Sequence, residues 1–190
     1  MRLFLALDFD EAARTALTLY VGEAEKILED FRWKVRWTPP QNLHVTVVFL
    51  GELAPPLLPV LSASLRTTAN SYGVFELHFT LPGFFPPLRR RPRVFHVQDE
   101  ERGGSVQHMH SALLSTCGRL VPALDQKPFV PHVTLARILR EGGPQVLEQL
   151  APCSIRVPFS HVVLMDSELT PKGPLYHRLE HFPLGGPNEV

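Results

Sequence analysis

The amino-acid sequence contains the same short pattern twice, about half a chain apart. The tripeptide His-Val-Thr occurs at residues 44–46 and again at residues 132–134, an offset of 88 residues. Residues 2–8 likewise read like residues 93–99, an offset of 91 residues. Near-equal offsets of two separate segments predict an internal duplication.

The length of the chain limits how such a duplication can fold. A chain of 190 residues can form one well-packed core, but it is too short for two ordinary domains with a linker. We therefore expect a single compact domain over residues 1–190, built from two internal repeats at about residues 1–88 and 89–184. The tail at residues 185–190 is expected to fray.

The charge balance argues against partners that are held by a global electrostatic field. Lysine plus arginine and aspartate plus glutamate both number 19, so the formal net charge is zero, and any contact with a polyanion must be local. The longest apolar runs are strand-sized and the N-terminus has no cleavable apolar segment, so we expect no membrane span and a cytoplasmic protein. Cys117 and Cys153 match no metal or redox spacing.

Each repeat is predicted to contain a strand, a helix, a histidine strand, a short helix and a further strand. Asp10 can cap a helix whose apolar residues recur at three- and four-residue steps, and Ser105 is the candidate cap of its counterpart. Residues 75–81 alternate apolar and polar side chains, which is typical of a sheet with one wet face. Residues 82–92, rich in proline and arginine, are predicted to form the loop between the repeats.

The two His-Val-Thr copies lie in strand-like segments. Because side chains two apart in a strand share a face, His44 and Thr46 should point to one side, as should His132 and Thr134. A lone histidine in this setting would be an ordinary polar residue on a half-exposed sheet. Its recurrence at the equivalent place predicts instead that both pairs face one groove.

Two imidazoles and two hydroxyls are suited to the opening of a cyclic phosphodiester. That reaction needs a base for the attacking water and an acid for the departing alkoxide. Imidazole serves in either role because its unperturbed pKa of ~6.5 lies close to working pH. Threonine hydroxyls can donate hydrogen bonds to the non-bridging phosphate oxygens, where negative charge concentrates.

The motifs also resemble a known family. Two His-x-Thr motifs half a chain apart resemble the 2H phosphoesterase superfamily, and the surrounding sequence is similar to the bacterial RNA 2′,3′-cyclic phosphodiesterases, first described as 2′-5′ RNA ligases. The similarity runs nearly from end to end and includes residues 2–7, 37–46, 49–51, 92–94, 128–137, 167–169 and 173–176.

This resemblance implies both a fold and an activity. The fold is α+β, with two pseudo-symmetric lobes, each a mainly antiparallel sheet backed by helices, and a central groove. The activity is hydrolysis of RNA 2′,3′-cyclic phosphate ends to 2′-phosphates without a metal ion or other cofactor. Microscopic reversibility adds 2′-5′ RNA ligation as the reverse reaction. The partner is thus an RNA end, with no membrane, and we expect a monomer.

The resemblance also assigns roles to individual residues. His44 would protonate the leaving 3′ oxygen, His132 would activate water, and Thr46 and Thr134 would hold the phosphate oxygens. The assignment of acid and base is left open by the residues themselves. Arg137 matches an arginine that often follows the second motif and would neutralise phosphate charge. It stands an odd number of residues from His132, so it reaches the groove only if the strand ends or bulges near Ala136.

Further candidates for contact with RNA lie outside the motifs. Phe9 and Trp37 can stack on a terminal base, although packing in the core is the ordinary role of such residues. Arg89, Arg90 and Arg91 form the core of the only basic cluster in the sequence and can contact RNA phosphates. A solvated loop is the alternative for these three arginines.

Two other functions compete with hydrolysis. The first is a non-catalytic nucleotide or RNA-end binding module on the same fold, which the presence of both histidines and both threonines disfavours. The second is a metal enzyme that uses His44 and His132 as ligands. A metal site would need a carboxylate or a third imidazole within the motifs, and neither is found there.

Overall fold

The computed structural model describes residues 1–101, 104–121, 124, 127–171 and 173–186 of the chain. The strands are β1 (Arg2–Asp8), β2 (Lys34–Trp37), β3 (His44–Glu52), β4 (Phe75–Phe85), β5 (Val94–Asp99), β6 (His132–Arg140), β7 (Ile155–Phe159), β8 (His161–Thr170) and β9 (Gly173–Pro183). The helices are α1 (Glu11–Asp30), α2 (Leu58–Ala69), α3 (Ser105–Gly118) and α4 (Val146–Gln149), with single 3₁₀ turns η1 (Pro40–Asn42), η2 (Pro55–Leu57) and η3 (Leu88–Arg90). Most of the predicted tail, residues 187–190, lies outside the described residues.

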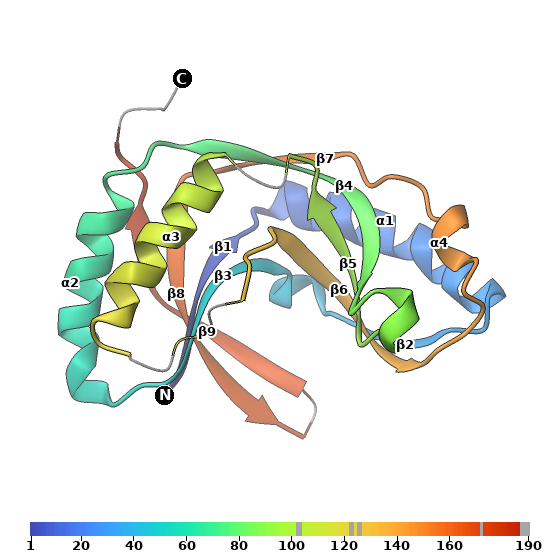
Figure 1. Cartoon of the computed structure of the whole chain (residues 1–190), viewed down its shortest axis with the longest axis horizontal. Coiled ribbons are helices and arrows are strands. Elements are labelled where there is room, and N and C mark those ends of the chain that lie inside the picture. Colours follow the sequence, from blue (N-terminus) through green and yellow to red (C-terminus); the bar gives the residue numbers. More distant parts are fainter. Residues whose placement is uncertain (102–103, 122–123, 125–126, 172, 187–190) are drawn as a thin grey trace.

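The strands form one twisted sheet that is divided into two lobes (Figure 1). Their order is β7-β4-β5-β6-β3-β1-β8-β9, with β2 paired to the free part of β6, and every described pairing is antiparallel. The two lobes are joined where β3 meets β6, at the pair Val45 and Val133. The predicted α+β class with two antiparallel lobes is therefore confirmed.

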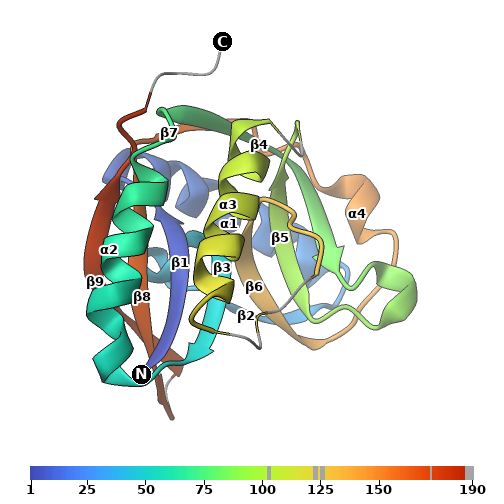
Figure 2. The ribbon, with the colours of Figure 1, turned by 60° about the vertical axis from the view of Figure 1, so that its left-hand side comes forward.

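Each lobe contains strands from both halves of the sequence. β4, from the first half, pairs with β5 and β7 of the second half, whereas β8, from the second half, pairs with β1 of the first. The helices are distributed between the lobes in the same way. α2 and α3 pack together over the lobe of β1 and β3 (Figure 2), and α1 packs beside β7 and α4 (Figure 1). The internal duplication itself stays a prediction.

The helix starts are only partly as predicted. The Asp10 carboxylate accepts a hydrogen bond of 2.7 Å from the backbone N–H of Ala13 and so caps α1. The buried stripe of that helix consists of Ala13, Leu17, Tyr20, Ala24 and Leu28. Ser105 is instead the first residue of α3, whose cap position is Gly104 with a φ of 74°. A left-handed conformation of this kind favours glycine.

The predicted loop over residues 82–92 is shorter in the structure. β4 continues to Phe85, and Pro82 pairs with Val97 of β5. On its other side β4 pairs with β7 only from Phe75 to Phe79. Pro82 therefore has no strand partner on that side, where its missing N–H would otherwise cost a hydrogen bond. The irregular connection between the repeats is therefore confined to the segment around η3.

Candidate active site

Both motifs meet at the joint between the two lobes. Val45 and Val133 are paired there, and the residues that flank them point to the opposite face of the sheet. In antiparallel register, each histidine lies across from the threonine of the other motif. One cleft of about 560 Å³ is lined by all four side chains, His44, Thr46, His132 and Thr134, together with Arg137.

The His44 ring is oriented by its own strand. Its Nδ1 lies 2.7 Å from the carbonyl oxygen of Asn42 and therefore carries the proton that it donates. Its Nε2 lies 3.0 Å from Thr46 Oγ1, whose hydroxyl donates to it when the ring is neutral. Phe4 and Tyr176 pack against the ring with centroid distances of 5.0 and 5.1 Å. The lone pair of Nε2 is thus held at a fixed position beside the Thr46 hydroxyl.

The His132 ring is held in the same way. Its Nδ1 lies 2.7 Å from the carbonyl oxygen of Val130, again two residues upstream. Phe85 meets the ring edge-on at a centroid distance of 4.9 Å, and His96 lies 5.5 Å away. Both histidines therefore leave Nε2 as the reactive nitrogen, which is what a pair of acid and base catalysts requires.

Burial lowers the pKa of both histidines because the cleft disfavours the charged ring. For His44 the pKa falls to about 4, although the backbone carbonyl of Asn42 and the Asp8 carboxylate partly oppose the change. The pKa of His132 is also lowered by burial, and the Arg137 guanidinium acts in the same direction. Both imidazoles are therefore neutral at neutral pH. A bound anionic phosphate would stabilise the protonated form.

A β-bulge brings Arg137 to the cleft. Along β5, Phe95 pairs with Ala136 and His96 pairs with Thr134, so Leu135 has no partner on β5. Leu135 and Ala136 are consequently both buried, and the next residue turns outward. Without the bulge, alternation along the strand would put Arg137 on the face opposite His132. With it, Arg137 lines the same cleft as the motifs.

The first motif has a matching bulge with a different outcome. Phe4 pairs with Phe49 of β3, and further along the same pairing Val47 is left without a partner. The residue at the position of Arg137 is here Phe49, which is 43% exposed and lines the cleft. The Arg2 guanidinium carbon lies 5.2 Å from the centre of this ring. Strand parity did not indicate Phe49, because it lies five residues beyond His44 and should share the opposite face; only the bulge at Val47, set by pairing with β1, turns it toward the cleft.

Asp8 is a further residue that the sequence did not reveal. It pairs with His44 across β1 and β3. Its carboxylate accepts a hydrogen bond of 2.5 Å from Arg178 Nε and forms a short ion pair with Arg14. Arg178 lies 170 residues away along the chain, so no local signal announces this contact. The result is an ordered carboxylate beside His44 and none that pairs with His132 in the described structure.

The predicted RNA contacts differ in where they lie. Phe9 is only 4% exposed and packs between Phe79 and Phe159, with centroid distances of 5.7 and 5.6 Å. The prediction of an RNA contact at Phe9 is therefore wrong, because the residue after β1 turns into the core. Trp37 lines the cleft, and its indole N–H donates 2.7 Å to Glu25. Arg89, Arg90 and Arg91 are exposed around η3 but do not line the cleft.

The fold and the site together define the 2H phosphoesterase class. Two antiparallel lobes join where the two His-x-Thr strands meet, and the motif side chains line one cleft. The chain belongs to the 2′-5′ RNA ligase superfamily, whose sequence model matches residues 21–171. The family resemblance noted from the motifs is thereby confirmed.

Individual relatives cover almost the whole chain. The chain is 35% identical to the RNA 2′,3′-cyclic phosphodiesterase of Thermus thermophilus, over 98% of this chain and 91% of that protein. It is 30% identical to the protein of the same name from Methanothermobacter thermautotrophicus, over 97% and 99%. Among solved structures, TT0787 of Thermus thermophilus superimposes with a TM-score of 0.80 at 32% identity, over 98% of this chain and 99% of that chain. LigT of E. coli shares the fold, with a TM-score of 0.76 at 22% identity over 97% and 98%.

The described residues also bear on two other features, a metal centre and a membrane-spanning helix. Among these residues, no three histidine, cysteine, aspartate or glutamate side chains lie close enough together to hold a metal ion. No helix in the described part of the chain is both long enough and apolar enough to cross a bilayer.

Proposed function

We propose that this protein hydrolyses RNA ends that carry a 2′,3′-cyclic phosphate and leaves a 2′-phosphate. The observation that carries the proposal is that one cleft is lined by two histidines whose Nδ1 atoms are both occupied by backbone carbonyls. Relatives of nearly full length that are named RNA 2′,3′-cyclic phosphodiesterase support the choice of substrate.

The proposed reaction is an in-line displacement at phosphorus. His132 Nε2 takes a proton from water as the water oxygen bonds to phosphorus. The bond from phosphorus to the 3′ oxygen breaks, and that oxygen receives a proton from His44 Nε2. Thr46 and Thr134 donate to the non-bridging oxygens, and Arg137 neutralises the charge that remains.

The surroundings of the two histidines support this division of roles. Asp8 lies beside His44 and favours its protonated form, which an acid must have at the start. Arg137 lies near His132 and disfavours its protonated form, which suits a base. With a ribose 5′-hydroxyl in place of water, the same displacement gives a 2′-5′ linkage, but the excess of water favours hydrolysis.

The decisive experiment is an assay of the purified protein on a short RNA with a 2′,3′-cyclic phosphate end, in the presence of a chelator. The expected product has its phosphate on the 2′ oxygen. A protein that binds this RNA without turning it over would be a binding module instead. Turnover that stops with chelator and returns with added metal would replace the proposed mechanism with metal catalysis.

The threonines are expected to make partial contributions. Thr46→Ala and Thr134→Ala each remove one donor to a charged oxygen, so kcat/KM for the cyclic end should fall by about ten- to hundredfold. Thr67→Ala is the matched control, since its hydroxyl donates to a carbonyl of α2 on the exposed surface. A loss as large as that of a histidine variant would mean that the threonine does more than bind oxygen.

The setting of the activity is part of the same proposal. We propose that the protein acts as a monomer in the cytoplasm, with an RNA end as its partner. Light scattering of the purified chain tests the first point. A dimer at micromolar concentration would contradict it.

A further inference from the structure

Arg36 is one of three arginines that line the cleft, with Arg2 and Arg137, and it has no role in the proposed reaction. It lies on β2 directly across from Arg137 on β6, and both side chains line the cleft. Both are exposed. Trp37, the next residue, also lines the cleft and is paired with Ala136.

Two like charges face each other in this arrangement. Directly opposed like charges on neighbouring strands destabilise a sheet. Elsewhere in the described structure, arginines such as Arg66 and Arg156 form ion pairs with carboxylates. In the same described regions, no salt bridge is formed by Arg36 or Arg137. Among the described residues, this pair of cations in the cleft therefore has no carboxylate in ion-pair contact.

The positive charge continues along the same two strands. Lys34 is paired with Arg140 in the next charged position, with a register shift between the two pairs. All four side chains are exposed, so the row leads from the cleft toward the far end of β2. The lobe of β1 is different, because its cleft arginine, Arg2, lies on Phe49, and Asp8 adds a negative charge near His44.

The position of this pair fits a second phosphate. Arg137 is three residues beyond Thr134, one of them in the bulge, which corresponds to about 7 to 10 Å along the strand. That distance is close to the length of one nucleotide in an extended single strand. A cyclic phosphate between the motifs would thus place the preceding phosphate of the RNA near Arg36.

We propose that Arg36, beside Arg137, binds the internucleotide phosphate on the 5′ side of the terminal nucleotide and thereby makes RNA ends better substrates than free cyclic mononucleotides. The inference rests on the proposed function, because it concerns the same cleft. Arg36 acts here on a part of the RNA that does not react. Binding energy of this kind raises kcat/KM for the longer substrate.

The test compares two substrates, a 2′,3′-cyclic mononucleotide and a dinucleotide with the same cyclic 3′ end. The wild-type protein is expected to have a kcat/KM about tenfold higher for the dinucleotide, the effect of one charge-assisted contact. Arg36→Gln should bring the ratio of the two values close to one, and Arg36→Lys should restore part of it. Added salt should reduce the ratio in the wild type more than in Arg36→Gln.

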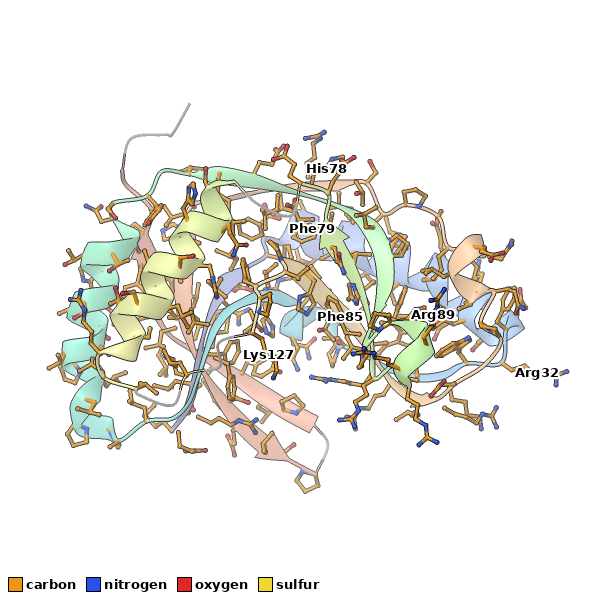
Figure 3. All side chains as sticks on the ribbon, viewed as in Figure 1. Arg32, His78, Phe79, Phe85, Arg89 and Lys127 are labelled. Atoms are coloured by element: carbon orange, nitrogen blue, oxygen red, sulfur yellow. The ribbon has the colours of Figure 1, made fainter. Side chains whose placement is uncertain are left out.

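The control is Arg32→Gln, which removes the same charge from the turn before β2. The Arg32 side chain points away from the molecule at its far end (Figure 3), so this variant should keep the wild-type ratio. The inference is overturned if Arg36→Gln lowers kcat/KM for both substrates by the same factor, which leaves the ratio of the two values unchanged. Failure of the wild type to turn over either substrate would instead overturn the proposed function, and the inference with it.

Discussion

His44→Ala and His132→Ala are each expected to lose about 10²- to 10⁴-fold in the rate of cyclic phosphate hydrolysis, the usual contribution of one positioned acid or base. Both rings present Nε2 to the cleft because Nδ1 is bonded to a carbonyl two residues upstream. Alanine keeps the strand but removes the proton carrier. The measurement is single-turnover cleavage of an RNA with a cyclic end, with folding checked by circular dichroism.

The two roles can be separated with a modified substrate. A cyclic phosphate with sulfur in place of the 3′ oxygen needs no acid, because a thiolate leaves without a proton. It should rescue His44→Ala but not His132→Ala. His161→Ala, at an exposed histidine of β8, should keep full activity. Rescue of His132→Ala alone would exchange the two roles, and full activity of either cleft variant on RNA would refute the mechanism.

The second large effect is a loss of stability in mild acid that arises from His96. This ring is 1% exposed, stacks on Phe85 at 3.8 Å and has a buried Nδ1 without a described hydrogen-bond partner. Burial, with a smaller effect of His132, lowers the pKa of His96 from 6.5 to about 3. Between these values the unfolded chain binds a proton that the folded chain does not, so stability falls as the pH falls.

From this one histidine, the free energy of unfolding is expected to fall by on the order of 3 kcal/mol between pH 6.5 and pH 4. His96→Phe keeps a ring against Phe85 but cannot take up a proton. Urea unfolding at both pH values should therefore show a smaller loss in this variant than in the wild type. His161→Phe, at an exposed position, serves as the control. Equal losses in the wild type and His96→Phe would show that His96 is not responsible.

The parts of the site that could be predicted from the sequence are those that depend on local periodicity. Alternation along a strand is enough to place His44 with Thr46 and His132 with Thr134 on one face. Recurrence of the pattern then predicts that the two pairs share a groove, and all four line one cleft. The Asp10 cap of α1 is another local signal that the structure confirms.

The parts that could not be predicted depend on contacts between distant strands. The bulge at Leu135 is set by pairing with β5, so strand parity alone left the direction of Arg137 open. The salt bridge from Arg178 to Asp8 joins opposite ends of the chain. Phe9 follows a strand that also carries site residues, and only packing against Phe79 and Phe159 shows that it belongs to the core.

The exchange of strands between the two lobes has a consequence for how the protein is made. During synthesis β1 cannot pair with β8, nor β4 with β5 and β7, until those later strands have been made, so neither lobe can form its full sheet earlier. Contacts between such distant segments slow folding. A nascent or truncated chain that ends near residue 88 would expose the unpaired edges of β1 and β4, and exposed strand edges promote aggregation. His44 and His132 can be brought together only after β6, which ends at Arg140, has been synthesised.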